Sequence, residues 1–404
     1  MSSASPSHRG GIESGKAASL ADTASPCSFE CEEPRPFQDP SLGLVLTGGG
    51  AFGAWEAGAL ETLFDYWNQK YGTDPPIRLV VGTSTGALIA PFAALGRTAV
   101  HYVADWYQRV TTKDIYRLSL LHLLRFQSIY DWGFPDERCV PRRGLYRKYA
   151  EVLQGLELPD GRDALEAVAR AWASSADRKI VAASVIDFST GATDYVMNSP
   201  DDLPPAGPDE GRYCSRFYDG VFASAVPPLL GPPTPILGRT ARFPGKTPHF
   251  DGGPYQEAPF DVFFEIQSEQ RVRLTHVILI SSYPFFPGSD GKPAQATRFP
   301  ADPNILEIGG RFDSVLSEAA VTNLTRLACQ TLRLQAKGHD PEQIRKHTGM
   351  RPPHCRDGEI PQLVTAFPHE RMGFDPDRFN ETEMGEMRRR GQTQALPLFR
   401  RYFP

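Results

Sequence analysis

The sequence predicts an α/β fold of three layers, α/β/α, with a mostly parallel central sheet. Apolar runs of strand length alternate with helical stretches along the chain, which is the order that parallel strands and crossover helices produce. The run 275–281 is almost continuously apolar, as expected of a strand buried on both faces. Two earlier apolar runs end in glycine-rich turns that lead directly into helices.

The strands are predicted where Val, Ile and Leu gather between turn residues. They are expected at 42–46, 79–81, 179–186, an edge-like 192–197 and 275–281, with a further strand that delivers Asp251. The helices are predicted from the glycine turns that open them and from apolar positions at helical spacing. They are expected at 54–67, 85–95, across 99–176, and at 219–225, 312–336 and 380–390. Asn380 is the predicted N-cap of the last helix, with Glu383 in the capping-box position.

Ser84 stands between Gly82 and Gly86, where an apolar run meets an alanine-rich helical one. This G-x-S-x-G pattern, completed by Thr83 and Thr85, is typical of a nucleophile elbow, a strand-to-helix turn so tight that glycine is needed on either side of the serine. The helix that follows directs its unpaired N–H groups and its positive dipole end toward the serine. The pattern predicts Ser84 as a catalytic nucleophile.

A second glycine motif lies upstream, in the run Leu-Thr-Gly-Gly-Gly-Ala-Phe-Gly at 46–53. Its glycines also fit the G-x-G-x-x-G dinucleotide fingerprint, which requires an acidic residue at the end of the next strand. That strand ends in the serine elbow instead. The loop is therefore interpreted as an oxyanion hole whose backbone N–H groups meet developing negative charge. The alternatives are a nucleotide-binding loop and a turn with no chemistry. The oxyanion-loop residues are Gly48, Gly49, Gly50, Ala51 and Gly53.

Asp251 precedes Gly252 and Gly253. Asp-Gly-Gly is common in ordinary turns. Beside a predicted serine nucleophile it is also a candidate general base, because a serine hydroxyl is a weak nucleophile until a neighbouring group takes its proton.

At these three motifs the chain resembles the patatin-like phospholipase family. The family has a glycine-rich oxyanion loop, then G-x-S-x-G, then a distant D-G-[GA], in the same order. The segment Ala-Ser-Ala-Val-Pro-Pro at 223–228 also looks like the family's A-S-x-A-x-P segment. The resemblance spans about residues 42–259. It implies a Ser84–Asp251 dyad without a catalytic histidine, and a phospholipid or other lipid acyl ester as substrate.

Three positions depart from the family pattern. Phe52 stands where the family's oxyanion loop often carries Arg or Lys, so the loop has no basic side chain at this position. Pro254 replaces a more usual aliphatic residue after the Asp-Gly-Gly turn. Glu257 stands where an Asn is frequent, six residues after the aspartate. Glu257 is therefore expected to change the electrostatics near Asp251.

An α/β-hydrolase with a Ser-Asp-His triad is the main alternative. Its order along the chain is Ser, Asp, then His. The later candidates for the histidine are His276, His339, His347, His354 and His369. The pattern fits less well, because the elbow of that fold follows several strands, whereas here it follows the second predicted strand.

Composition and motif spacing bound the remaining possibilities. The net charge of −5 gives no general attraction to nucleic acid. Six cysteines without a C-x-x-C pair indicate neither a zinc site nor a disulfide framework, and are expected as free thiols in a reducing compartment. The predicted hydrolysis needs no metal and no organic cofactor.

The domain expectation is a disordered tail at 1–40, one catalytic domain at 41–300 with a helical insertion at about 99–176, and a helical extension at 301–404. The motifs interlock from residue 48 to residue 253, which argues for one catalytic domain.

No run has the length of a signal peptide or a membrane span, so a cytoplasmic or peripheral membrane location is expected. The apolar stretch 118–134 is interpreted as an acyl groove, a lid or a buried helix. The basic clusters at 388–390 and 398–403 are interpreted as a membrane-facing surface or as solvated helix ends.

Overall fold

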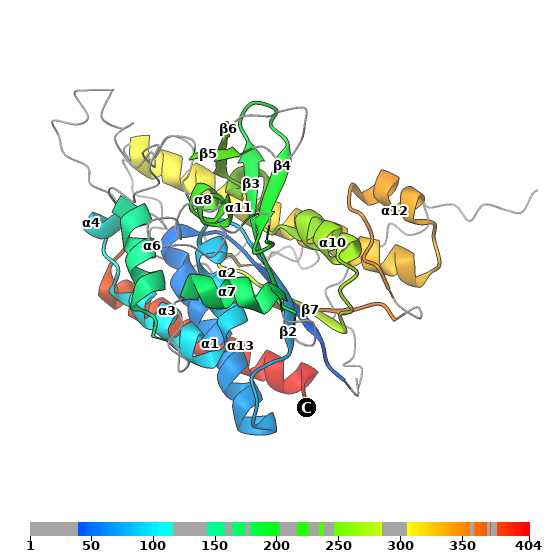
Figure 1. The fold of residues 1–404 in the computed structure, drawn as a ribbon, viewed down its shortest axis with the longest axis horizontal. Coiled ribbons are helices and arrows are strands. Elements are labelled where there is room, and N and C mark those ends of the chain that lie inside the picture. The colour runs from blue at the N-terminus through cyan, green and yellow to red at the C-terminus, as the bar shows by residue number, and fades with distance from the viewer. Residues whose placement is uncertain are drawn as a thin grey trace, which may run out of the picture.

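A mixed sheet lies between two layers of helices in the computed structural model of the protein (Figure 1). The structure describes residues 39–115, 144–157, 164–173, 178–200, 202, 216–225, 234–237, 246–284, 305–355, 359–369, 372 and 378–404. The predicted tail at 1–40, apart from its last two residues, and the apolar stretch 118–134 lie outside this part of the chain.

The sheet runs in the order β5-β6-β3-β2-β1-β7-β8, with β4 also paired to β3. Strands β1, β2, β3, β7 and β8 run parallel to one another, whereas β4 and β6 pair antiparallel with β3, and β5 pairs antiparallel with β6. The bounds are β1 Leu42–Leu46, β2 Ile77–Gly82, β3 Ile180–Asp187, β4 Thr193–Met197, β5 Thr234–Leu237, β6 Lys246–Asp251, β7 His276–Ile280 and β8 Gln362–Ala366. The predicted α/β fold with a mostly parallel sheet is thus confirmed.

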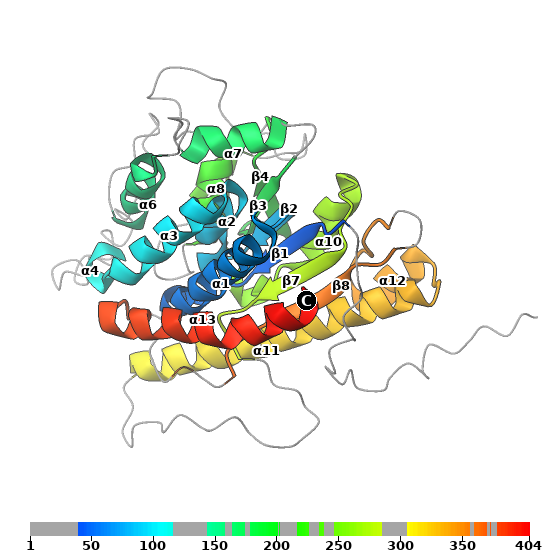
Figure 2. The same cartoon turned by 90° about the horizontal axis from the view of Figure 1, so that it is seen from below.

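Helices α1 and α2 pack on one face of the sheet, and α10 packs on the other (Figure 2). Right-handed crossovers explain this arrangement. The chain moves from β1 to β2 to β3 in one direction across the sheet and from β6 to β7 in the opposite direction, so the helices of these connections lie on opposite faces. A short 3-10 turn at Gly50–Phe52 precedes α1. The helix bounds are α1 Gly53–Tyr71, α2 Thr85–Leu95, α3 Arg97–Arg109, α4 Thr112–Ile115, α6 Gly144–Gly155, α7 Ala164–Ala173, α8 Arg216–Ser224, α9 Gly253–Gln256, α10 Phe260–Glu269, α11 Ile305–Ala336, α12 Pro341–Thr348 and α13 Glu381–Tyr402.

The first two βα units match the prediction closely. Strands β1 and β7 are buried along their whole length, and α2 has the predicted bounds. Asn380 caps α13, its side chain accepting hydrogen bonds from the Thr382 and Glu383 N–H groups. The C-terminal region, however, is not only helical, because β8 adds a parallel strand beside β7. The run Gln-Leu-Val-Thr-Ala at 362–366 is short and neither continuously apolar nor alternating, so it gives only a weak strand signal in the sequence.

Helices α1 and α13 cross so closely that their backbones touch. A Cβ on Gly391 would collide with the Trp55 carbonyl, and a Cβ on Gly58 would collide with the Arg388 carbonyl. The buried Glu61 carboxylate bonds the Arg388 guanidinium beside this crossing, at 2.5 Å. Arg388 also pairs with Asp105, so the side chain of this basic residue is held within the protein rather than offered to a membrane.

Replacing Gly391 by alanine is expected to destabilise the fold by about 1–3 kcal/mol, because the added methyl forces two packed backbones apart. Gly385→Ala on the same helix is the matched control. There a Cβ meets only the flexible Gln108 amide, at 3.0 Å, and the higher helix propensity of alanine favours the fold by up to about 1 kcal/mol. Urea unfolding measures both changes, and equal midpoints for the two variants would contradict this view of the crossing.

Candidate active site

Ser84 occupies a strained turn between β2 and α2. Its φ of 54° and ψ of −121° lie outside the regions that L-residues favour, at a cost of about 1–3 kcal/mol that the surrounding structure must offset. Two close approaches hold the turn: a Cβ on Gly82 would overlap the Gly86 carbonyl, and a Cβ on Gly86 would lie 2.5 Å from the Thr47 carbonyl oxygen. Ser84 is partly exposed while its neighbours Thr83 and Thr85 are buried.

Ser224, the serine of the Ala-Ser-Ala segment, links this turn to β3 by hydrogen bonds. Ser224 is fully buried at the end of α8. Its Oγ accepts a hydrogen bond from the Ser84 N–H over 2.9 Å and donates to the Ser184 carbonyl over 2.6 Å. The Ser84 amide is therefore committed to the fold, and its side chain is the group left at the surface.

The glycine loop lies directly against the elbow. Gly49 has a φ of 137°, a conformation that favours glycine. The Gly50 carbonyl accepts hydrogen bonds from Thr85 Oγ1, at 3.1 Å, and from the Tyr107 hydroxyl, which ties the loop to α2 and α3. Within the described residues, no backbone acceptor takes the Gly49, Gly50 or Ala51 N–H, whereas the Gly53 N–H bonds back to the turn. Of the predicted oxyanion donors, Gly53 is thus already engaged.

Asp251 reaches the elbow through the register of β3. Gly82 pairs with Ala183 and Asp251 pairs with Val185, two residues further along β3. Strand β4 pairs with Ala182–Ile186 and so occupies the opposite edge of β3 from both partners. Strands β2 and β6 therefore meet end to end on one edge of β3, offset by about 7 Å. Consistent with this, a Cβ on Gly252 would lie 3.3 Å from Thr83 Cγ2.

These elements fall within one family match. A family model described as patatin-like phospholipase covers residues 44–264, more than half of the chain. The chain belongs to the patatin-like phospholipase family. It is accordingly a lipid acyl hydrolase, and lipids are its class of substrate.

Among solved structures, VipD from Legionella pneumophila is similar to this patatin-like chain. The two share 10% sequence identity over 91% of this chain and 67% of VipD, with a TM-score of 0.34. A likeness of this size adds nothing to the family assignment. No curated protein sequence matches the chain.

Glu257 lies at the centre of this patatin-like site. Its Oε1 is 2.5 Å from the position that a Gly48 Cβ would take, and the Ser84 Cβ is 2.8 Å from the same position. Its Oε2 and Asp251 Oδ1 lie 2.8 and 3.2 Å from the position of a Gly253 Cβ. Asp251 Oδ1 itself accepts the Gly253 N–H over 2.8 Å. Glu257 thus places a second buried carboxyl between the predicted nucleophile and the predicted base.

Glu56 is a third carboxyl of the site, fully buried behind the glycine loop. Its Oε1 accepts the Thr47 N–H over 2.7 Å. Burial raises the pKa of Glu56 well above the ordinary glutamate value, and the nearby Glu257 raises it further. The carboxyl therefore stays protonated in the fold at pH values where it ionises in the unfolded chain.

Glu56→Gln is expected to stabilise the protein at pH 8 and to change little near pH 4.5. A raised folded-state pKa means that stability is lost as the pH rises above the unfolded-state value of 4.5. Glutamine keeps the acceptor for Thr47 without that loss, which reaches about 1.4 kcal/mol for each unit of pKa shift. Thermal unfolding at both pH values measures the difference, with Glu157→Gln, at an exposed position, as control. A variant no more stable than wild type at pH 8 would show that the fold does not raise the pKa of Glu56.

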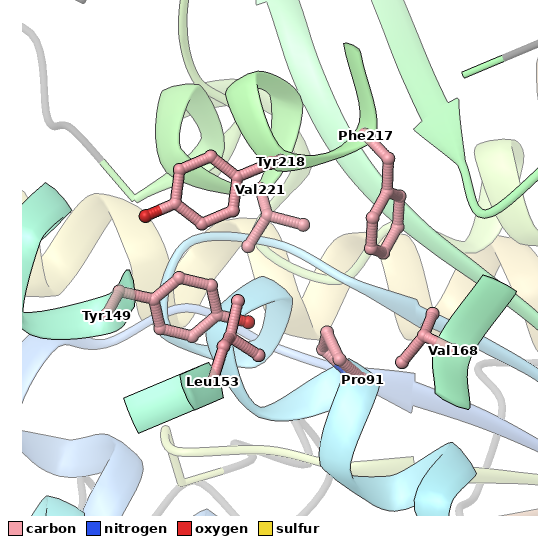
Figure 3. A pocket seen from close by; sticks show the side chains of 7 residues that line it. All are labelled: Pro91, Tyr149, Leu153, Val168, Phe217, Tyr218 and Val221. Atoms are coloured by element: carbon pink, nitrogen blue, oxygen red, sulfur yellow. The ribbon is translucent and has the colours of Figure 1, made fainter. Parts of the chain in front are cut away.

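A small, apolar cavity lies beside the helix that Ser84 opens. Figure 3 shows its lining side chains, which come from α2, α6, α7 and α8. The Tyr149 and Tyr218 rings stack with centroids 6.0 Å apart, and the Tyr149 hydroxyl donates to the Leu88 carbonyl over 3.1 Å. Burial raises the pKa of Tyr149, which keeps it neutral. The lining residues are Pro91, Tyr149, Leu153, Val168, Phe217, Tyr218 and Val221.

The sequence patterns do not single out Ser184, Gln256 or Glu56, although all three are buried at the site. Ser184 had a signal, since it is a polar residue inside the otherwise apolar run 180–186. Gln256 and Glu56 had none, because a single polar residue in a helix normally faces solvent.

Proposed function

We propose that the protein hydrolyses lipid acyl esters with Ser84 as nucleophile and Asp251 as general base. The observation that carries the proposal is the shared edge of β3, where the elbow and the Asp251 turn meet. The N–H groups of Gly49, Gly50 and Ala51 are the proposed oxyanion donors. Preorganised donors of this kind are worth about 3–4 kcal/mol each in serine hydrolases.

The reaction has two halves. Asp251 takes the hydroxyl proton as Ser84 Oγ bonds to the ester carbonyl carbon, and the loop N–H groups stabilise the resulting oxyanion. The ester C–O bond then breaks, and the leaving alcohol receives the proton from Asp251. In the second half Asp251 takes a proton from a water molecule, and the oxygen of that water attacks the carbonyl carbon of the acyl-enzyme. The bond to Ser84 Oγ breaks, the serine recovers its proton, and a fatty acid is released.

A peripheral membrane contact is part of the proposal. No helix in the described part of the chain is long and apolar enough to cross a membrane. Phe188 follows the last residue of β3, at the end of the sheet where the candidate site lies, and is 65% exposed. Its ring packs on Phe250, the residue before Asp251, at 4.9 Å between centroids. An exposed aromatic ring beside the candidate site supports contact with the lipid surface that holds the substrate.

The purified protein tests the function directly. It is incubated with vesicles of a mixed phospholipid extract, and released fatty acids are quantified by mass spectrometry. Release is expected from wild type and not from Ser84→Ala. Equal or faster turnover of a water-soluble monomeric ester than of the vesicles would argue against a lipid substrate.

Phe188→Ser is expected to lower the rate on vesicles several-fold while leaving the rate on a soluble short-chain ester unchanged. Burying a phenylalanine side chain is worth about 1.5–3 kcal/mol, which sets the scale of lost surface binding. Tyr71→Ser is the matched control, because Tyr71 is 45% exposed at the far end of α1. A parallel loss in both assays would mean that Phe188 supports the fold rather than the contact with lipid.

A further inference from the structure

A chain of buried hydrogen bonds joins the elbow, Gly82–Gly86, to the turn that follows Asp251. It begins at the Ser84 N–H, which bonds Ser224, and passes from the Ser224 hydroxyl to the Ser184 carbonyl. The Ser184 hydroxyl then donates to Gln256 Oε1 over 3.0 Å. Ser184 and Ser224 are fully buried, so water does not compete for the bonds that their hydroxyl groups donate.

Gln256 closes this chain and contacts both sides of the site. It is the last residue of α9 and is 5% exposed. Its main-chain N–H donates to the Gly252 carbonyl over 2.7 Å, and its carbonyl accepts from Thr83 Oγ1 over 2.8 Å. Its Nε2 donates to Thr193 Oγ1 over 2.6 Å and also to the Asp261 carboxyl. One residue thus binds the elbow, β3, β4 and the turn of the predicted base.

We propose that Gln256 is a positioning residue that fixes the Asp251 turn against the elbow, so that the Asp251 carboxylate stays within reach of Ser84. The inference rests on the proposed dyad. Strand β6 pairs with β3 through three residue pairs, and a single helical turn follows it. With so short a backbone ladder, the direction of the Asp251 side chain depends on the side-chain bonds of Gln256.

The expected effect follows from the geometry of proton transfer. The base must lie at hydrogen-bond distance from the serine hydroxyl, about 2.6–3.2 Å. A displacement of about 1 Å lowers the rate by about 100-fold. Gln256→Ala is therefore expected to lower kcat by about 10- to 100-fold with KM unchanged within about twofold. The rate of Ser84 labelling by a fluorophosphonate is expected to fall in parallel, since it depends on the same base.

Gln267 supplies a matched control on the next helix. It is 1% exposed, and its side-chain amide also makes three hydrogen bonds, to the Val272 carbonyl and to the main-chain groups of His354. Gln267→Ala is expected to lower the melting temperature about as much as Gln256→Ala, with kcat and labelling rate close to wild type. A structural role alone would move both variants together.

Two milder variants keep the test decisive where Gln256→Ala fails to fold. Thr83→Val preserves the side-chain shape and removes the bond to the Gln256 carbonyl, and Ser184→Ala removes the bond to its amide. Each is expected to lower kcat at constant KM, by about 3- to 30-fold. Thr325→Val, at another fully buried threonine whose Oγ1 bonds the Val321 carbonyl in α11, is expected to retain the wild-type kcat.

Asp251→Asn is measured in the same series to separate the two proposals. An inactive Asp251→Asn with Gln256→Ala as active as Gln267→Ala would overturn the positioning role and leave the dyad standing. A fully active Asp251→Asn would overturn both. Loss of kcat in Gln256→Ala and in Asp251→Asn, with Gln267→Ala active, supports the positioning role.

Discussion

Ser84→Ala is expected to abolish fatty acid release, with a loss of at least about 10³-fold in kcat/KM. Without the hydroxyl no acyl-enzyme forms, and only binding and oxyanion stabilisation remain to accelerate attack by water. The fold should be preserved or made more stable, because alanine keeps the Cβ of the serine and removes only the hydroxyl group from the strained turn. Fatty acid release from vesicles and thermal unfolding are measured on the same preparation.

Labelling by a fluorophosphonate identifies the nucleophile independently of any substrate. Wild type is expected to be labelled at Ser84, and Ser84→Ala is expected to lose the label. Ser189→Ala is a suitable control, since Ser189 is an exposed serine in the turn after β3. A label that persists on another serine in Ser84→Ala would remove Ser84 from the nucleophile role.

Asp251→Asn is expected to lower kcat/KM by about 10²–10⁴-fold, the usual contribution of general-base assistance. The asparagine amide keeps the shape of the side chain and still accepts the Gly253 N–H, but it cannot take the proton of Ser84. Circular dichroism confirms that the variant is folded. Activity within tenfold of wild type would exclude Asp251 as the base.

The alternative Ser-Asp-His triad makes a different prediction for the later histidines. His276 is the first residue of β7, which runs in the same direction as β1 and β2. It therefore lies at the amino ends of these strands, whereas Ser84 follows the carboxyl end of β2. His347 bonds Gln330 on α11, and the main chain of His354 bonds Gln267. Single changes to glutamine are therefore expected to cost little activity at His276, His339, His347, His354 and His369. One folded histidine variant as inactive as Ser84→Ala would replace the dyad with a triad.

The first half of the fold was predictable because its signals are local. The elbow at Ser84 follows from the crowding at Gly82 and Gly86, which the glycine spacing reveals directly. The bounds of α2 follow from the same turn, and β7 follows from its unbroken apolar run. Strand β8 escaped prediction because its five residues mix polar and apolar side chains without a regular pattern, whereas pairing with β7 places it in the sheet.

The sequence by itself determined which residues are predicted to supply the chemistry: a serine in an elbow, a glycine loop before it and an aspartate in a glycine turn. Only the tertiary structure decided how they meet. The antiparallel entry of β6 on the β2 edge of β3 brings Asp251 to the elbow from about 170 residues away, and no local pattern encodes that register. The same holds for Gln256 and Glu257, whose partners come from distant strands and loops. Steric crowding within a turn acts between chain neighbours, whereas strand pairing and buried hydrogen bonds depend on the packing of the whole domain.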